Sequence, residues 1–169
     1  MPNVMLRRFD VSDAKALASI GDCPKIALQM SHRFPSPYTI EDAVHFIEKR
    51  ASAPDSESFA IEADGHLVGG CGASLGSDEV GHTHLIGYWL GERFWGKGIA
   101  TVAVSLLVDF VMEHYPRTLR LEARVLGGND ASGRVLEKNG FAREAVLKQR
   151  LLRRDGIIVD ECIYARFFA

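Results

Sequence analysis

Four residues between a predicted strand and a predicted helix have the types and spacing that bind a phosphate group. Arg93, Gly96, Lys97 and Gly98 lie within Gly87–Thr101, which we interpret as a strand end, a glycine-bearing loop and the first turn of a helix. A helix start presents unpaired N–H groups and a partial positive charge, and glycines let an anion approach the backbone closely. Arg93 and Lys97 add full positive charges. We therefore infer a phosphate-bearing ligand at this loop.

Three glycine motifs compete for this loop. A Walker A loop would accommodate Gly96 and Lys97, but Gly98 stands where the magnesium-binding hydroxyl is needed. A Rossmann fingerprint has Thr101 in place of its third glycine and belongs in an opening βαβ unit, not mid-chain. The third pattern, R/Q-x-x-G-x-G/A, is filled completely by Arg93, Gly96 and Gly98. The stretch thus resembles the pyrophosphate loop of the GNAT superfamily of N-acetyltransferases. The alternative is an ordinary strand-to-helix turn without a ligand.

A second block of residues supports this resemblance. Asn129–Phe141 matches N-x-x-S-x-x-V-L-E-K-x-G-F, which resembles the second signature block of the ribosomal-protein N-acetyltransferases of the RimJ/RimL type. Gly87–Leu90 before the loop and Ile163–Arg166 near the end of the chain agree with that branch. Because three separated blocks agree, the chain is identified as a RimJ/RimL-like member of the GNAT superfamily, and the resemblance covers nearly its whole length.

The resemblance implies acetyl-CoA as co-substrate and a primary amine as acceptor, with no metal. The pyrophosphate would bind the amides around Gly96–Ala100, with Arg93 and Lys97 balancing its charge. The pantetheine arm resembles a peptide and would pair with the strand at Tyr88–Leu90. In the family this strand splays from the next one, which would leave a slot. The expected cofactor-binding residues are Tyr88, Trp89, Leu90, Arg93, Gly96, Lys97, Gly98, Ile99, Ala100, Thr101, Asn129 and Ser132.

Acetyl transfer also needs a stabilised thioester oxyanion and a proton for the leaving thiolate. The resemblance implies a backbone N–H near Leu90 as the oxyanion donor. The tyrosine that many GNAT enzymes use as the acid falls on Leu136, so that acid is absent. In the RimJ/RimL type the serine of N-x-x-S is thought to serve instead, which is Ser132 here. The alternative for Ser132 is a first-turn hydroxyl that only caps the helix backbone.

The general base is less well defined. Many relatives carry a glutamate near Leu85, and this sequence lacks it. His84 shares a predicted strand face with Tyr88 and has a suitable pKa, the alternative being a solvated histidine at a strand start. Carboxylates on later strands are further candidates or simply solvated strand residues: Glu122, Asp160 and Glu161.

The elements around these motifs alternate between hairpins and helical crossovers. Asp64-Gly65 and Asp155-Gly156 are hairpin signals, because a type I′ turn needs positive φ at both central residues. Between them we predict a helix from Ile99 to about Met112 and a short helix over Asn129–Lys138. This pattern predicts an α/β (α+β) fold with a mixed, mostly antiparallel sheet of six to seven strands and helices on both faces. Three glycines in the predicted strand 67–73 indicate a bulge or a close backbone contact: Gly69, Gly70 and Gly72.

Composition bounds the class of protein. The 169 residues suit one domain, 1–169, with a sizeable core. Twenty basic against 22 acidic residues give a net charge of −2, which offers no argument for nucleic acid or an acidic membrane. The most apolar run, 102–112, is too short to span a bilayer. Three widely spaced cysteines suggest no disulfide framework and favour the cytoplasm: Cys23, Cys71 and Cys162.

The acceptor is predicted from the lack of a strong base. Deprotonating a lysine side chain at pH 7 costs about 4.6 kcal/mol, against roughly 1 to 1.4 kcal/mol for an α-amine. We therefore predict an α-amine or another low-pKa amine, on a protein N-terminus or a small molecule. The irregular segment Cys23–Tyr38 would shape the acceptor side, as it does in relatives of this fold. The alternative from another class is a non-catalytic acyl-CoA-binding sensor or interaction module.

Overall fold

The computed structural model describes residues 2–51 and 56–169, and one sheet of seven strands runs through them in the order β1-β2-β3-β4-β5-β7-β6. Within it β4 and β5 are parallel, and every other neighbouring pair is antiparallel. The mixed, mostly antiparallel sheet predicted from the sequence is confirmed. The strands are β1 (Val4–Arg7), β2 (Ser56–Ala63), β3 (His66–Leu75), β4 (Thr83–Leu90), β5 (Arg120–Leu126), β6 (Ala142–Leu152) and β7 (Ile158–Phe167).

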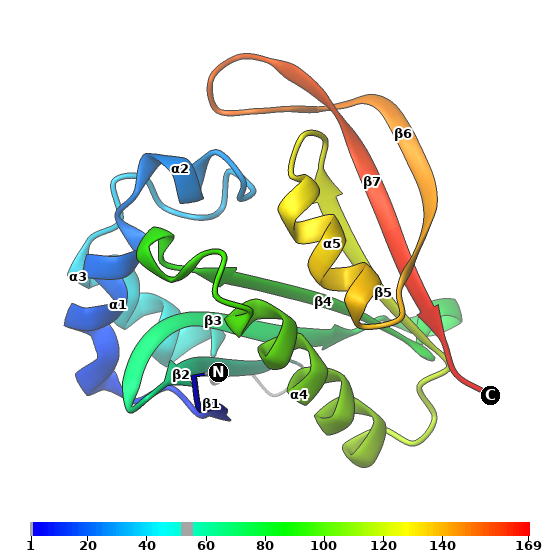
Figure 1. Cartoon of the computed structure of the whole chain (residues 1–169), viewed down its shortest axis with the longest axis horizontal. Helices are drawn as coiled ribbons and strands as arrows, with labels where there is room; N and C mark the ends of the chain where they lie inside the picture. Colours follow the sequence, from blue (N-terminus) through cyan, green and yellow to red (C-terminus); the bar gives the residue numbers. More distant parts are fainter. Residues whose placement is uncertain (1, 52–55) are drawn as a thin grey trace.

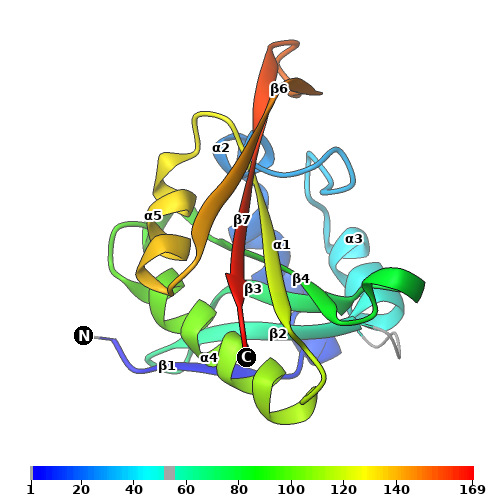
Figure 2. The same cartoon turned by 90° about the vertical axis from the view of Figure 1, so that its right-hand side faces the viewer.

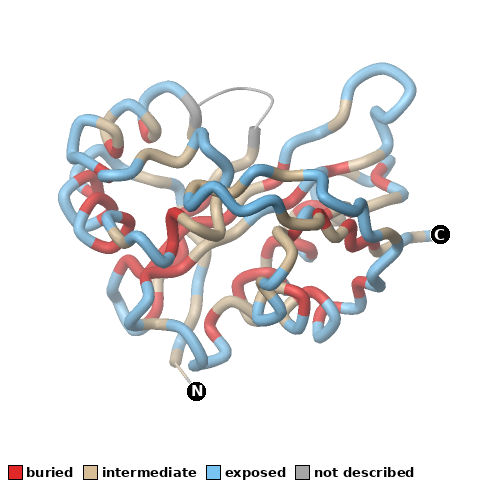
Figure 3. Tube along the Cα trace, turned by 90° about the horizontal axis from the view of Figure 1, so that it is seen from above, coloured by how far each residue is buried: buried red, intermediate tan, exposed pale blue. Residues whose placement is uncertain are grey.

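Helices cover both faces of the sheet, as predicted (Figures 1 and 2). On one face α4 (Ile99–His114) and α5 (Asp130–Lys138) pack through a core that includes Leu107, Leu121 and Leu136. On the other face α1 (Ala14–Gly21) and α3 (Ile40–His45) pack around a second apolar cluster, and α2 (Pro24–Ala27) lies between them in the chain. Buried segments follow the sheet and the inner sides of these helices (Figure 3). The cofactor motifs on α4 and α5 therefore share one face.

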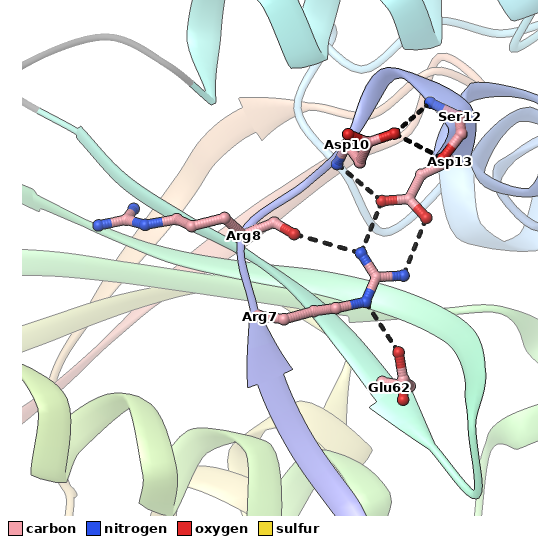
Figure 4. Close-up of polar contacts among 6 residues, drawn as sticks. All are labelled: Arg7, Arg8, Asp10, Ser12, Asp13 and Glu62. Carbon is pink, nitrogen blue, oxygen red and sulfur yellow. Dashed lines mark hydrogen bonds and ion pairs between the residues drawn. The ribbon is translucent and has the colours of Figure 1, made fainter.

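Arg7 ties the edge strand β1 to both β2 and the start of α1 (Figure 4). Its Nε donates to Glu62 Oε2 at 2.8 Å, and its two Nη atoms donate to the carboxylate of Asp13 at 2.7 and 2.8 Å. Asp13 also accepts from the backbone N–H of Asp10 at 2.9 Å. The hydrogen bonds from Arg7 hold the pKa of Asp13 below its usual range. This network fixes α1, and with it the chain that leads to α2, against the sheet.

The glycines of β3 mark both a bulge and a close backbone contact. Gly69 pairs with Leu90, and a Cβ at Gly69 would lie 2.1 Å from the carbonyl oxygen of Trp89. On the other side, the register with β2 shifts between Ile61 and Glu62. The glycine at this position therefore lets β3 approach the end of β4, which is the strand that leads to the loop.

We expect Gly69→Ala to destabilise the protein by about 1 to 3 kcal/mol, because the new methyl group must push β3 away from β4. Gly87→Ala is the matched control, since a Cβ at Gly87 on β4 would meet no atom within 4 Å. Urea denaturation measures both free energies of unfolding. Equal unfolding midpoints for the two variants would show that the close contact does not constrain the sheet.

Candidate active site

The pairing of β4 with β5 stops halfway along β4. Thr83–Ile86 pairs with Arg120–Ala123. Beyond that point Gly87–Leu90 continues to pair with β3, and Arg124–Leu126 continues to pair with β7. The two halves of the sheet therefore diverge (Figure 1), and the facing strand edges leave backbone groups unpaired. The predicted divergence of β4 from β5 is confirmed, and we call the region between the unpaired parts of these strands the slot.

The loop that follows β4 presents backbone N–H groups to the outside. Gly96 has φ 72° and Gly98, the N-cap of α4, has φ 78°, both in the left-handed region. A Cβ at either glycine would meet no atom within 4 Å. The hydrogen bonds found among the described residues use none of the N–H groups of residues 96–101. Free N–H groups at the positive end of a 16-residue helix are a favourable arrangement for holding an anion.

At the start of α4, the side chains of residues 99–101 differ from one another in burial. Ile99 is buried in the core, Ala100 is half-buried, and the carbonyl of Thr101 accepts from Asn139 Nδ2 at 3.1 Å. What the buried Ile99 offers a ligand is therefore its backbone N–H group, whereas Thr101 also has a partly exposed side chain. The hydrogen bond to Asn139 also joins α4 to α5, so the loop and the second motif are held in one orientation.

Two cations flank the loop. Arg93 and Lys97 are exposed, and neither forms a salt bridge with any described residue. Both lie over the ring of Phe94, with the Arg93 guanidinium carbon 4.7 Å and Lys97 Nζ 5.8 Å from its centroid. A cavity of about 1340 Å³ adjoins them and is also lined by Lys15 from α1. The charges of both residues are thus available to balance a bound phosphate.

Ser132 and Tyr88 meet across the slot. The Tyr88 hydroxyl lies 2.7 Å from Ser132 Oγ and donates to the Ser132 carbonyl at 2.9 Å. Asn129 is the N-cap of α5, and its Oδ1 accepts from the backbone N–H of Ser132 at 3.3 Å. The capping role is therefore filled by Asn129, and the serine hydroxyl is not the cap. Burial raises the pKa of Tyr88 to about 12, so its hydroxyl stays protonated at neutral pH.

Tyr164 is a residue near this pair that the sequence motifs did not single out as part of the site. It pairs with Ala123, the last residue of β5 that still pairs with β4. A Cβ at Gly133 would lie only 2.5 Å from the Tyr164 hydroxyl oxygen, so Tyr164 reaches the turn of α5 that carries Ser132. The register of β7 on β5 places Tyr164 beside α5. No local sequence motif reveals that register.

Trp89 and Leu90 are placed differently from Tyr88. The Trp89 ring lies on the opposite face, 5.4 Å from the ring of Phe34, within the cluster around α1 and α3. Leu90 is buried in the core, and its carbonyl accepts from Trp95 Nε1 at 2.8 Å. The side chains of Trp89 and Leu90 therefore do not face the slot, and the predicted cofactor contact of these two residues is limited to their backbone groups. The Trp89 ring instead supports the segment expected to shape the acceptor side.

The structure does not bring His84 to the slot. His84 is 1% exposed, and its Nδ1 is 3.0 Å from Thr118 Oγ1. Its ring packs on Tyr115 at 4.7 Å, and burial holds its pKa below the ordinary value. It precedes Tyr88 by four strand residues, about 13 Å along β4, in the part where the sheet is closed. A packing role therefore replaces the predicted role of His84 as base.

Glu122 is also poorly placed to be a general base. It accepts from Arg120 Nη2 at 2.9 Å and from Arg124 Nε at 3.0 Å. Burial alone would raise its pKa, but the two arginines outweigh burial and hold the pKa below its ordinary value. A carboxylate stabilised in this way is a weak base. Asp160 likewise accepts from Lys148 Nζ at 2.9 Å, and Oε2 of the buried Glu161 lies 3.9 Å from Arg150 Nε. Each of these carboxylates therefore has a cationic partner.

Other site chemistries find little support in the described part of the chain. Within residues 2–51 and 56–169, no three His, Cys, Asp or Glu side chains are grouped to hold a metal ion. Cys23, Cys71 and Cys162 are free thiols. None of the helices described here is both long enough and apolar enough to cross a membrane.

Comparison with known proteins agrees with this geometry. Residues 3–142 match the family model described as "Acetyltransferase (GNAT) domain". The chain is 29% identical over 150 residues to the protein named "Uncharacterized N-acetyltransferase p20" of Bacillus licheniformis, covering 85% of this chain and 81% of that one. It is also similar to the structure of Mycobacterium smegmatis RimJ in complex with CoA-disulfide, with a TM-score of 0.84, 27% identity, and coverage of 97% and 81%. The microcin C7 self-immunity acetyltransferase MccE, in complex with acetyl-CoA and AMP, gives a TM-score of 0.82 at 25% identity, with coverage of 98% and 92%. The chain therefore belongs to the GNAT family of acetyl-CoA-dependent N-acetyltransferases, and RimJ is among its neighbours.

Proposed function

We propose that this enzyme transfers the acetyl group of acetyl-CoA to an α-amine or another amine of low pKa. The observation that carries the proposal is the split between β4 and β5, which has free N–H groups at one end and the Tyr88–Ser132 pair across it. The pyrophosphate would lie on the amides of residues 96–101, balanced by Arg93 and Lys97. The pantetheine would pair with the open edge of β4 at Tyr88–Leu90. The bound CoA species in the RimJ and MccE structures support this donor.

The leaving group would receive its proton from Ser132. As the amine nitrogen bonds to the thioester carbon, the C–S bond breaks and the sulfur takes a proton from the Ser132 hydroxyl. Tyr88, protonated and 2.7 Å from Ser132 Oγ, orients that hydroxyl and can restore its proton, and Tyr88 then regains a proton from solvent. A backbone N–H near Leu90 would stabilise the oxyanion. The excess proton of the attacking amine passes to solvent.

The acceptor class follows from the weakness of the available bases. His84 is buried away from the slot, and Glu122 has a lowered pKa. Asp160 and Glu161 are paired with Lys148 and Arg150. A protonated lysine side chain would be about 3 kcal/mol harder to deprotonate at pH 7 than an α-amine. An α-amine already exists partly as the free base near neutral pH. We therefore place a peptide N-terminus or a small amine of similar pKa ahead of a lysine side chain.

Paired peptides test the acceptor class. One peptide has a free N-terminus and no lysine, and the other has the same sequence with a blocked N-terminus and one lysine. We expect faster acetylation of the free N-terminus at pH 7, measured by mass spectrometry of the product. The ratio should narrow as the pH rises above 8, because the neutral fraction of lysine continues to grow after the α-amine is fully deprotonated. Faster acetylation of the blocked peptide at pH 7 would contradict the proposal.

The wider setting of the enzyme is also part of the proposal. One continuous sheet includes strands from Val4 to Phe167, which supports a single domain over 1–169. We propose that this domain works in the cytoplasm on soluble acceptors, without a nucleic-acid or membrane partner. The net charge of −2 supports this, because it offers no general attraction to polyanions.

A further inference from the structure

Arg154 joins two parts of the chain that lie far apart in the sequence. It sits in the turn between β6 and β7, and its guanidinium donates to backbone carbonyls of the segment after α2. Nε donates to the carbonyl of Ala27 at 3.1 Å, and Nη2 donates to those of Ser31, at 3.1 Å, and Phe34. No carboxylate among the described residues forms a salt bridge with Arg154. Its hydrogen-bonding capacity is thus directed to one short segment, 27–34.

The turn that carries Arg154 is closed by backbone hydrogen bonds, and the Arg153 side chain stays within it. Arg153 donates to Asp155 through Nε at 3.0 Å and through Nη2 at 2.6 Å. The backbone N–H of Gly156 donates to the Arg153 carbonyl at 2.9 Å, and that of Arg153 donates to the Ile157 carbonyl at 2.9 Å. The neighbouring arginine is therefore used within the hairpin, whereas Arg154 is used outside it.

The segment held by Arg154 has little regular structure of its own. Helix α2 ends at Ala27, and the carbonyls of Ala27, Ser31 and Phe34 accept from Arg154. The Phe34 ring of this segment lies 5.4 Å from the ring of Trp89, which directly follows Tyr88 on β4. Segment 27–34 therefore contacts both β4 and the turn between β6 and β7.

The same segment also contains an unsatisfied hydrogen-bond acceptor. Gln29 Oε1 is buried and has no hydrogen-bond donor among the described residues. A buried acceptor without a donor is destabilising, so the large majority of buried acceptors in proteins are hydrogen-bonded. Gln29 lies between Ala27 and Ser31, whose carbonyls Arg154 holds. A ligand carrying N–H donors, as a peptide amine does, would match such a group.

We propose that Arg154 is a positioning residue for the acceptor amine. By fixing segment 27–34, which contacts Trp89 in the part of β4 that no longer pairs with β5, it builds a wall against which a short peptide or polar amine binds. The inference rests on the proposed acetyl transfer. It predicts that Arg154 influences the KM for the acceptor, and that it affects neither acetyl-CoA affinity nor the chemical step at saturating acceptor.

Steady-state kinetics and hydrogen exchange on three variants test this role. Arg154→Gln should raise the KM for the acceptor peptide roughly tenfold or more, since several hydrogen bonds from a charged group are lost. It should leave kcat and the Kd of CoA unchanged and speed amide exchange in residues 27–34. Arg154→Lys should recover part of the loss, because an ammonium can reach these carbonyls but lacks the planar fork. Arg153→Gln removes the same charge from the same turn and should leave both readouts at wild-type values.

The possible outcomes separate this inference from the proposed function. An unchanged KM for Arg154→Gln in an active enzyme would overturn the acceptor role alone. An equal rise in KM for Arg153→Gln would overturn it as well, because the cause would then be the hairpin and not the contact of Arg154. Absence of turnover in the wild-type protein with every amine would overturn the proposed function and the acceptor role together.

Discussion

Ser132→Ala is expected to lower kcat by roughly 10²-fold or more while leaving the affinity for acetyl-CoA nearly unchanged, which is the usual scale for loss of a general acid. The hydroxyl lies at the slot and contacts Tyr88 at 2.7 Å. The helix itself does not depend on this hydroxyl, because Asn129 provides the N-cap of α5. The loss should therefore appear in the chemical step and not in folding or in donor binding.

Two further variants locate the origin of that loss. Tyr88→Phe removes the partner of Ser132 but keeps the acid, so we expect a smaller loss in kcat than for Ser132→Ala. Ser105→Ala removes an exposed hydroxyl from α4 and should leave kcat unchanged. Each kcat is measured by thiol release at saturating acetyl-CoA and acceptor. A near-normal kcat for Ser132→Ala would reduce Ser132 to a structural role and leave the leaving thiolate to solvent.

Gly98→Val is expected to weaken CoA binding by roughly 100-fold or more in a protein that still folds, because a β-branched residue disfavours the left-handed region by about 1 to 3 kcal/mol. Gly98 has φ 78° at the N-cap of α4, and the space beside it is open. Valine would both displace the free N–H groups of residues 96–101 and occupy the approach of the pyrophosphate. Calorimetric titration with CoA measures the affinity.

Gly156→Val is the matched control for this variant. Gly156 has φ 82°, and a Cβ there would also meet no atom within 4 Å, so the backbone strain is comparable. It lies in the β6–β7 turn and not in the loop before α4. We expect its CoA affinity to equal that of the wild type, with melting temperatures confirming that both variants fold. Unchanged affinity in Gly98→Val would show that the pyrophosphate binds elsewhere.

Much of the fold could be predicted because its signals are local. The Asp64-Gly65 turn has φ 50° and 78°, as a type I′ hairpin requires. Gly140 ends α5 with φ 78°, and the N–H of Phe141 donates to the carbonyl of Leu136 at 3.1 Å. The loop before α4 could be predicted for the same reason, since Gly96 and Gly98 both adopt the positive φ that favours glycine.

What could not be predicted depends on contacts between distant parts of the chain. His84 shares the face of Tyr88, but its burial against Thr118 and Tyr115 comes from the loop after α4. The lowered pKa of Glu122 depends on the orientation of Arg120 and Arg124 on β5. Strand alternation places a residue on a face, but it does not show what covers that face.

Arg154 depends most strongly on contacts between distant parts of the chain. Its three carbonyl acceptors lie at least 120 positions earlier in the chain. No local pattern distinguishes it from Arg153, whose side chain stays within the hairpin. Only the closure of the sheet, with β7 inserted between β5 and β6, brings this turn to the segment after α2.

Amine-dependent release of free thiol from acetyl-CoA tests the central claim most directly. The alternative, a module that binds acyl-CoA without turnover, shares the loop and the slot and differs only in this measurement. Our account predicts thiol release that requires an amine, is fastest with a free α-amine at pH 7, and is lost in Gly98→Val. Tight CoA binding by calorimetry without amine-dependent thiol release, across α-amine peptides, lysine peptides and small amines, would contradict it.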